Sequence, residues 1–301
     1  MREVLNLNRD WRFRAESQKG HGTLTHAEAY AYAHAGSMGG IANVNLDDSD
    51  WRIVQLPHDY MSEAPFSEDA VHSHGFKCAY NAAYRKRFLL PETMMGKHLL
   101  LVFDGIAMCA RIYLNGSLMA RSFTAYTPVV IDITDRAYFG ERVNTLVVEV
   151  DGRALEGWFY EGAGIYRDVH LYVKERCHFV HDGIFLCPVQ QDDGTWRVDW
   201  RAEIENDAYD PDPVSVSVRI SLYDGEQPVA STAMDGHVRG DGGTIIQNGS
   251  FPVTSRSSGM WIRRIFTAHR SHCSVTAVSW TTTALRSDSV HSLRTANTDF
   301  S

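Results

Sequence analysis

The sequence predicts an all-β protein built from two consecutive β-sandwiches. Short apolar runs, alternating or continuous, follow one another through most of the chain and are separated by Gly, Asn, Asp and Pro turns. Leu99–Phe103 is a continuous run bounded by Gly96 and Asp104, which indicates a strand buried on both faces. No segment combines a 3.6-residue apolar stripe with helix caps. At 301 residues the chain is long enough for two domains.

The first half of the chain supplies most of these predicted strands. Asn115 and Gly116 follow one of them and form the dipeptide typical of a type I′ hairpin turn. Residues 61–82 form a long loop without periodicity, and such loops often carry the binding surface of a protein. The predicted strands cover residues 4–14, 53–56, 84–88, 99–103, 111–114, 129–133 and 145–150.

The second half continues in the same style after Val173. Turn-rich segments such as Gln190–Gly194 and Asn206–Pro213 separate its apolar runs. This spacing is typical of an immunoglobulin-like sandwich. The predicted strands cover residues 179–186, 196–204, 214–222 and 245–251.

Residues 256–301 depart from this pattern. Sixteen of these 46 residues are Ser or Thr, six are Arg, two are Asp, and none is Lys or Glu. The segment therefore has a net charge of +4, which leaves −12 for the remainder of a chain whose total is −8. Because no period of 2 or 3.6 residues survives, we expect an aberrant, disordered tail.

Composition and charge exclude several classes of partner. A net charge of −8 without a Lys/Arg cluster argues against nucleic acid. The chain has no run of about 18 apolar residues and no signal peptide at Met1–Asn6, so we expect no membrane partner. Five scattered cysteines without a Cys-x-x-Cys pair favour a reducing, cytoplasmic setting and indicate no metal site. The histidines of residues 17–45 match no ligand spacing, so that stretch is interpreted as a surface insertion.

Residues 156–167 read Glu-Gly-Trp-Phe-Tyr-Glu-Gly-Ala-Gly-Ile-Tyr-Arg and are the most distinctive stretch of the chain. Aromatic faces beside carboxylates suit sugars, which present both C–H faces and hydroxyl groups. A dinucleotide-binding loop is excluded, because Arg167 occupies the third glycine position and a strand follows where a helix should begin. No cofactor is therefore expected. A structural turn with buried aromatic rings remains the alternative.

Several segments of the first half form an ordered set. They are Asp47–Tyr60, Tyr84–Phe88, Phe103–Gly105 with Ile112–Gly116, Asn144–Val150 and Glu156–Val169. In this order they resemble the N-terminal sugar-binding domain of glycoside hydrolase family 2, the β-galactosidase and β-glucuronidase family. One departure is Tyr60, which stands where the family usually has Trp.

The resemblance implies a jelly-roll, galactose-binding-like domain over residues 1–175, a partial immunoglobulin-like domain over 176–255, and the tail 256–301. In the family, two glutamates on a following (β/α)₈ barrel act as acid/base and nucleophile of a retaining mechanism. A barrel needs about 250 residues. Only 46 residues follow residue 255, and the chain lacks the Asn-Glu dipeptide of the family's acid/base. We therefore assign no catalytic residue.

The resemblance also implies which residues meet the sugar. In the family, the loop before the Trp-Tyr motif and the loop before the Tyr-Arg-Lys strand reach the rim of the barrel's active site. By position, Glu156 and Asn81 are the candidate substrate-binding residues, and Trp158 and Tyr160 are candidate stacking residues. The alternatives are solvated loop positions for the first pair and packing between domains for the second.

The leading interpretation is an N-terminal fragment of a family 2 glycoside hydrolase acting on a β-galactoside or related carbohydrate. Its partner would be the catalytic barrel, without which we expect no activity, and a homo-oligomer is compatible with the full-length enzyme. Two alternatives stay open: a stand-alone carbohydrate-binding sandwich, and a structural or interaction module built on exposed sheet edges. Galactoside, glucuronide and mannoside enzymes share these motifs, so several sugars remain candidates.

Our hypothesis is that residues from about 255 onward are a frameshifted translation of a longer enzyme. The family's second domain usually ends with Leu-Trp-x-x-x-x-Pro-x-Leu-Tyr, and Gly-Phe-Arg follows. Read from each third base, the codons of Met260–Ile262 force Val-Asp, and permitted neighbouring codons complete Trp-Asp-Val-Asp-Pro-Thr-Asn-Leu-Tyr. In this stretch Trp and Leu-Tyr keep the spacing of the family motif, and Pro lies one position earlier. In the same frame, Ser287–Val290 can yield Gly-Phe-Arg.

We predict that the alternative frame stays open beyond codon 255 and encodes both motifs. Sequencing the gene past the present stop codon checks this. A stop codon shortly after codon 255 in the alternative frame would refute the frameshift.

Overall fold

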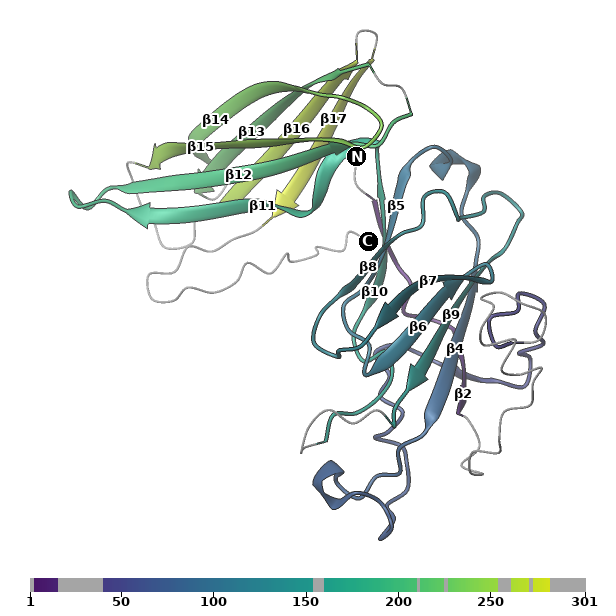
Figure 1. Ribbon diagram of the computed structural model, residues 1–301. Helices are drawn as coiled ribbons and strands as arrows, with labels where there is room; N and C mark the ends of the chain where they lie inside the picture. The colour runs from purple at the N-terminus through teal and green to yellow at the C-terminus, as the bar shows by residue number, and fades with distance from the viewer. Residues whose placement is uncertain are drawn as a thin grey trace. The chain divides into compact units, whose positions relative to one another are not determined.

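The computed structural model describes residues 3–15, 40–153, 160–209, 212–224, 227–253, 261–270 and 273–281. The chain divides into two compact units, one of residues 4–173 and one of residues 174–301 with the first three residues. The described residues form strands and two short 3₁₀ helices, η1 (His72–His74) and η2 (Glu92–Met94), which confirms the all-β prediction (Figure 1). No helix in the described part of the chain is long and apolar enough to cross a membrane.

The first unit is a sandwich of two sheets. Its strands are β1 (Glu3–Asn6), β2 (Trp11–Ala15), β3 (Arg52–Val54), β4 (Asn81–Phe88), β5 (His98–Phe103), β6 (Cys109–Leu114), β7 (Ser117–Ser122), β8 (Val129–Asp132), β9 (Asn144–Asp151) and β10 (Val169–Lys174). One sheet has the order β3-β2-β4-β9-β6-β7, and the other has the order β1-β10-β5-β8. Neighbouring strands thus come from distant parts of the chain, as in the predicted jelly roll.

The start of the chain differs from the prediction of one strand over residues 4–14. The structure has two strands there, β1 and β2, which lie in different sheets. The Asn6 side chain accepts a 2.8 Å hydrogen bond from the Asn8 amide, and Asp10 has a φ of 58°. The Asx turn at Asn6 and the left-handed conformation of Asp10 change the direction of the backbone between the two strands. The alternation of apolar residues continues through this change, so it did not predict the break.

Two local predictions are confirmed. Every residue of β5 is buried, so the apolar run at residues 99–103 is covered on both faces. Asn115 and Gly116 have φ values of 51° and 84°, and positive φ at both positions is what a type I′ turn requires.

The core of the first unit forms between the inner faces of its two sheets. Trp11, Tyr84, Phe103 and Ile112 are completely buried and belong to one continuous cluster. Their alternation with outward-facing neighbours follows the two-residue period of a strand. The largest side chains of both sheets are thus shielded together, which is the main source of this unit's stability.

A buried ion pair lies on the other face of the six-stranded sheet. Arg85 Nε donates to Asp48 Oδ2 at 3.0 Å, and both side chains are almost entirely buried. Arg85 Nη1 donates to the Ile41 carbonyl at 2.6 Å. Arg87 lies 3.3 Å from the other carboxylate oxygen of Asp48. The carboxylate thereby joins the Asp-Trp-Arg segment to the Tyr-Arg-Lys strand.

The strand register defines one end of this sandwich. Asp151, at the end of β9, pairs with Asn81 at the start of β4 and with Cys109 at the start of β6. Ser122, at the end of β7, pairs with Ala110. The segments 61–80, 104–108, 123–128 and the described parts of 152–168 (152–153 and 160–168) therefore lie at one end, called here the loop end.

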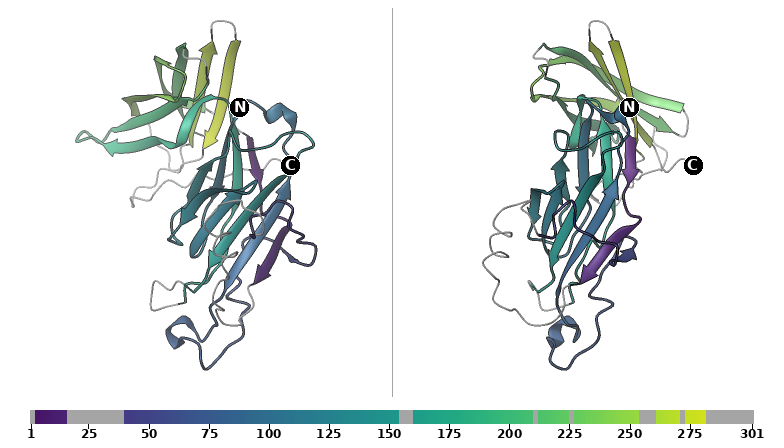
Figure 2. Two further views of the ribbon diagram at one scale, coloured as in Figure 1. Left: turned by 45° about the vertical axis from the view of Figure 1, so that its right-hand side comes forward. Right: turned by 90° about the vertical axis from the view of Figure 1, so that its right-hand side faces the viewer.

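The second unit is also a sandwich. Its strands are β11 (Cys177–Gln190), β12 (Trp196–Asn206), β13 (Val214–Asp224), β14 (Gln227–Val238), β15 (Gly243–Val253), β16 (Trp261–Arg270) and β17 (Cys273–Thr281). One sheet has the order β11-β12-β15, and the other has the order β14-β13-β16-β17. Figure 2 shows the strands of this unit, coloured teal to yellow, from two further sides. Its core includes Val198, Trp200 and Ile220, and its strand count is that of an immunoglobulin-like sandwich.

The expectation of a disordered tail is wrong for residues 261–270 and 273–281. These residues form β16 and β17, and β16 pairs with β13 from Ser215↔His269 to Tyr223↔Trp261. Strand pairing uses backbone N–H and C=O groups, which a segment of any composition except proline supplies. The unusual composition of the tail therefore did not exclude regular structure.

We predict that Asp48→Ala destabilises the first unit by about 3–5 kcal/mol, because it leaves the Arg85 guanidinium buried without its counter-charge. Denaturant unfolding followed by circular dichroism measures the change in the free energy of unfolding. Asp50→Ala is the matched control, since Asp50 is an exposed carboxylate two residues away. Equal effects of the two substitutions would contradict the assigned role of the ion pair.

Candidate functional site

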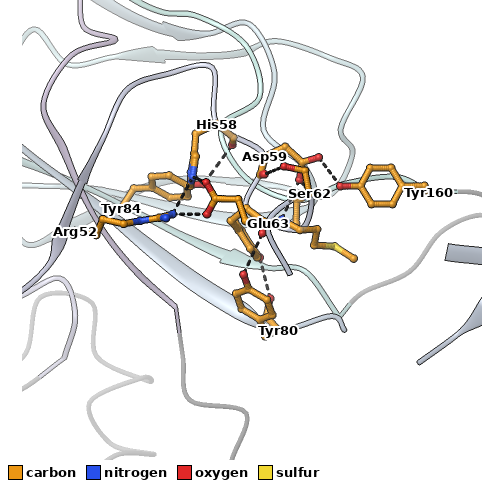
Figure 3. A network of polar contacts seen from close by, with 11 residues as sticks. Arg52, His58, Asp59, Ser62, Glu63, Tyr80, Tyr84 and Tyr160 are labelled. Atoms are coloured by element: carbon orange, nitrogen blue, oxygen red, sulfur yellow. Dashed lines mark hydrogen bonds and ion pairs between the residues drawn. The ribbon is translucent and has the colours of Figure 1, made fainter. Parts of the chain in front are cut away.

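The site lies at the loop end, where residues 58–60 run beside residues 163–165. The His58 amide donates to the Ile165 carbonyl at 2.8 Å, and the Tyr60 amide donates to the Ala163 carbonyl at 2.9 Å. The Pro-His-Asp-Tyr segment is thus joined by its backbone to the glycine-rich stretch, more than a hundred residues later in the chain. Figure 3 shows the polar network that surrounds this junction.

Two glycines permit this close approach. Gly162 has a φ of +71°, and a Cβ built there would lie 2.8 Å from Asp59 Oδ2. Gly164 has a φ of +132°, and its Cβ would lie 2.5 Å from the Tyr84 hydroxyl. Both the backbone conformation and the lack of space therefore require glycine.

The Asp59 carboxylate organises one side of the junction. It accepts hydrogen bonds from the Tyr160 hydroxyl at 2.6 Å, the Ala163 amide at 2.9 Å and the Met61 amide at 3.1 Å (Figure 3). Burial, together with the hydrogen bond to the Asp59 carboxylate, raises the pKa of Tyr160 well above its usual value. Tyr160 therefore keeps its proton and donates it in the hydrogen bond to Asp59, and this bond fixes the orientation of the ring.

His58 organises the other side. Its Nδ1 lies 2.8 Å from the Tyr84 hydroxyl, and its Nε2 lies 3.2 Å from Glu63 Oε1. Glu63 Oε2 also accepts a 2.5 Å bond from Arg52 Nη2. Burial lowers the pKa of His58, although the nearby Glu63 carboxylate opposes this effect. Partial burial opposes a low pKa for Glu63, but Arg52 and His58 outweigh it and lower that pKa.

Tyr60 and Tyr80 close the base of the loop that separates β3 from β4. The Tyr60 hydroxyl donates to the Tyr80 carbonyl at 2.8 Å, and the Tyr80 hydroxyl donates to the Tyr60 carbonyl at 3.0 Å. Their rings lie 4.9 Å apart between centroids. Tyr60 is fully buried, and the Tyr80 carbonyl satisfies its hydroxyl donor.

The predicted site residues are only partly described. Asn81 begins β4 next to Tyr80, and its buried Oδ1 lacks a hydrogen-bond partner among the residues that the structure describes. Tyr160 is held by Asp59 and keeps 40% of its surface exposed. Glu156 and Trp158 lie outside the described residues. The structure thus places Tyr160 in the network and leaves Asn81 as a buried acceptor near its base.

Sequence reasoning missed the residues that build the network, notably Arg52, Glu63 and Tyr84. Arg52 and Glu63 are eleven positions apart and meet only because the chain turns at residues 57–60. The adjacent His58 and Asp59 form no catalytic dyad: among the described residues, the His58 ring contacts Tyr84 and Glu63, while Asp59 bonds Tyr160. These contacts hold the loops in position.

The fold and this junction define a galactose-binding-like β-sandwich domain with a second sandwich after it. Residues 54–200 match the family model described as "Glycosyl hydrolase 2 galactose-binding domain-like". This part of the chain is therefore similar to the galactose-binding-like domain of glycoside hydrolase family 2.

Two curated relatives illustrate the similarity. A β-galactosidase from Thermoanaerobacter pseudethanolicus is 28% identical over 199 residues, which are 64% of this chain and 23% of that protein. A β-galactosidase from Bacteroides ovatus is 28% identical over 240 residues, which are 78% of this chain and 25% of that protein. The chain thus spans about a quarter of the length of these relatives.

Solved structures support the fold. A β-glucuronidase from Bacteroides uniformis aligns with a TM-score of 0.73 at 23% identity, covering 94% of this chain and 32% of that one. A glycosyl hydrolase family 2 member from Bacteroides cellulosilyticus aligns with a TM-score of 0.71 at 22% identity, covering 93% and 36%. At this identity the likeness establishes the architecture alone.

We predict that Asp59→Asn lowers the pKa of Tyr160, because the amide removes the negative charge that disfavours the phenolate. Ultraviolet absorbance during an alkaline titration measures phenolate formation. The difference between the two proteins should vanish in a Tyr160→Phe background, which assigns it to this residue. A Tyr160 titration unchanged by the asparagine substitution would contradict the direct bond.

Proposed function

We propose that this chain supplies the sugar-binding end of a family 2 β-glycosidase whose chemistry is carried by a separate catalytic barrel. The match of residues 54–200 to the family's galactose-binding-like domain carries this proposal. The curated relatives named as β-galactosidases support hydrolysis of a β-galactoside or a related carbohydrate as the activity of the whole enzyme. The partner domain would be the barrel.

In this proposal the junction of residues 58–60 and 163–165 holds the sugar-facing segment. Tyr160 presents an aromatic ring whose orientation is fixed by its bond to Asp59. Asn81 adds an amide whose oxygen lacks a hydrogen-bond partner among the described residues. Glu156 and Trp158 remain proposed members of the same set. None of the network residues is assigned a part in bond cleavage, because protein donors already engage the carboxylates of Asp59 and Glu63.

The stand-alone carbohydrate-binding protein is the second candidate. It is favoured by the exposed, oriented ring of Tyr160, which needs no barrel to meet a ligand. A cytoplasmic location is part of both proposals and rests on the scattered free cysteines. A homo-oligomer is proposed only for the full-length enzyme.

The frameshift of the tail also remains a proposal. It rests on the unusual composition of residues 256–301 and on the two sequences that the alternative frame can yield.

We predict that the chain alone hydrolyses neither a chromogenic β-galactoside nor a β-glucuronide, and that the product of the gene restored to the alternative frame hydrolyses one of them. Release of the chromophore measures both. Turnover by the chain alone would overturn the proposal. Saturable binding of galactose without turnover by either protein would favour the second candidate.

A further inference from the structure

The loop end of the first sandwich gathers exposed aromatic side chains. Among the described residues of this unit, the aromatic side chains with large exposed surfaces are Phe66 (75%), Phe76 (46%), Phe123 (67%), Tyr126 (58%) and Tyr160 (40%). All of them lie in three of the four segments that the register brings to the loop end.

The opposite end of the sandwich has a different surface. There, the described loops expose Leu89, Met95 and Val143, which are aliphatic. Tyr138 and Phe139 at that end are only partly exposed, and Phe139 packs against the core. The aromatic concentration is therefore a property of one end and not of the unit's surface in general.

The loop of residues 123–128 holds its two rings on a fixed backbone. Ala125 is buried, and its carbonyl accepts a 2.6 Å hydrogen bond from the Tyr166 hydroxyl. The Tyr126 amide donates to Thr124 Oγ1 at 3.3 Å. Phe123 and Tyr126 flank the buried anchor on either side, so their exposure results from a defined loop conformation.

The segment 61–80 is also internally braced. Lys77 Nζ donates to the carbonyls of Ser62 at 3.0 Å and Ala64 at 2.6 Å, and it lies 4.1 Å from the Phe66 ring centroid. The Ser67 amide donates to the Phe76 carbonyl at 2.9 Å. These contacts fix the two limbs of the segment beside each other and cover one face of the Phe66 ring.

Exposed aromatic rings on braced loops favour a ligand that stacks. Large apolar side chains left in water cost free energy, and clusters of them mark binding surfaces. Polar residues lie near these rings in sequence, as do Thr124 and Thr127 for Tyr126 and Glu68 and Asp69 for Phe66. A glycan chain presents both C–H faces and hydroxyl groups. A sugar ring has two faces, so one monosaccharide cannot stack on all five rings.

We propose that the loop end recognises an extended glycan chain of several sugar units, with Tyr160 serving one unit and the rings of segments 61–80 and 123–128 serving units further along. This inference deepens the proposed function, on which it rests for the carbohydrate class. It makes the substrate an oligosaccharide or polysaccharide.

The test is binding of the intact chain to an array of β-linked glycans, from monosaccharide to hexasaccharide, in galactose, glucose, mannose and uronic acid series. Affinity should rise with length in at least one series. Phe123→Ala/Tyr126→Ala and Phe66→Ala/Phe76→Ala should each weaken hexasaccharide binding about tenfold, the loss expected for about 1.4 kcal/mol of stacking. Binding of the monosaccharide should not change.

Phe185→Ala is the matched control, because Phe185 is 56% exposed on β11 of the other unit. Circular dichroism melting verifies that each variant is folded. Binding that is absent from all series, independent of length, or unaffected by both double substitutions would overturn the proposal. So would loss of self-association in the variants with unchanged glycan binding, which would identify a protein-docking surface. A restored full-length product that lacked hydrolase activity would refute the proposed function without altering the length dependence.

Discussion

The close approach of residues 58–60 to residues 163–165 is the constraint on which the loop end depends. Two backbone hydrogen bonds join segments that are far apart in sequence, and Gly162 and Gly164 leave the space that the approach needs. The Asp59 carboxylate then bonds two backbone amides and the Tyr160 hydroxyl. Because Asp59 is partly shielded from solvent, these three donors replace hydrogen bonds to water that its carboxylate has lost.

Hydrogen bonds among partly buried side chains fix the conformation of the loops at the loop end. His58, Tyr84 and Glu63 satisfy one another on one side of the junction, and the reciprocal bonds of Tyr60 and Tyr80 close the base of the neighbouring loop. Aromatic side chains can then stay exposed in fixed positions without collapsing onto the core. Such an arrangement suits recognition of a sugar, because binding then does not carry the entropy cost of ordering the loops.

Much of the fold could be predicted because strands leave a direct mark on sequence. The continuous run in β5 and the Asn115-Gly116 turn were both recognisable, since burial on two faces and positive φ each demand particular residue types. The division of residues 4–14 into two strands was missed, because a local Asx turn interrupts the chain without interrupting its apolar alternation. The strands at residues 261–281 were missed, because backbone pairing does not require a regular side-chain pattern.

The sequence by itself determined the all-β class, the order of the family motifs and the importance of the stretch that contains Tyr160, because each depends on local residue types and spacing. It could not determine that Tyr160 meets Asp59, that Arg52 meets Glu63, or that the exposed aromatic rings share one end. Only the tertiary structure decided these, because the first two follow from the turn after β3 and the approach of residues 58–60 to 163–165, and the third follows from strand register. A change of one residue in register turns every side chain of a strand to the opposite face.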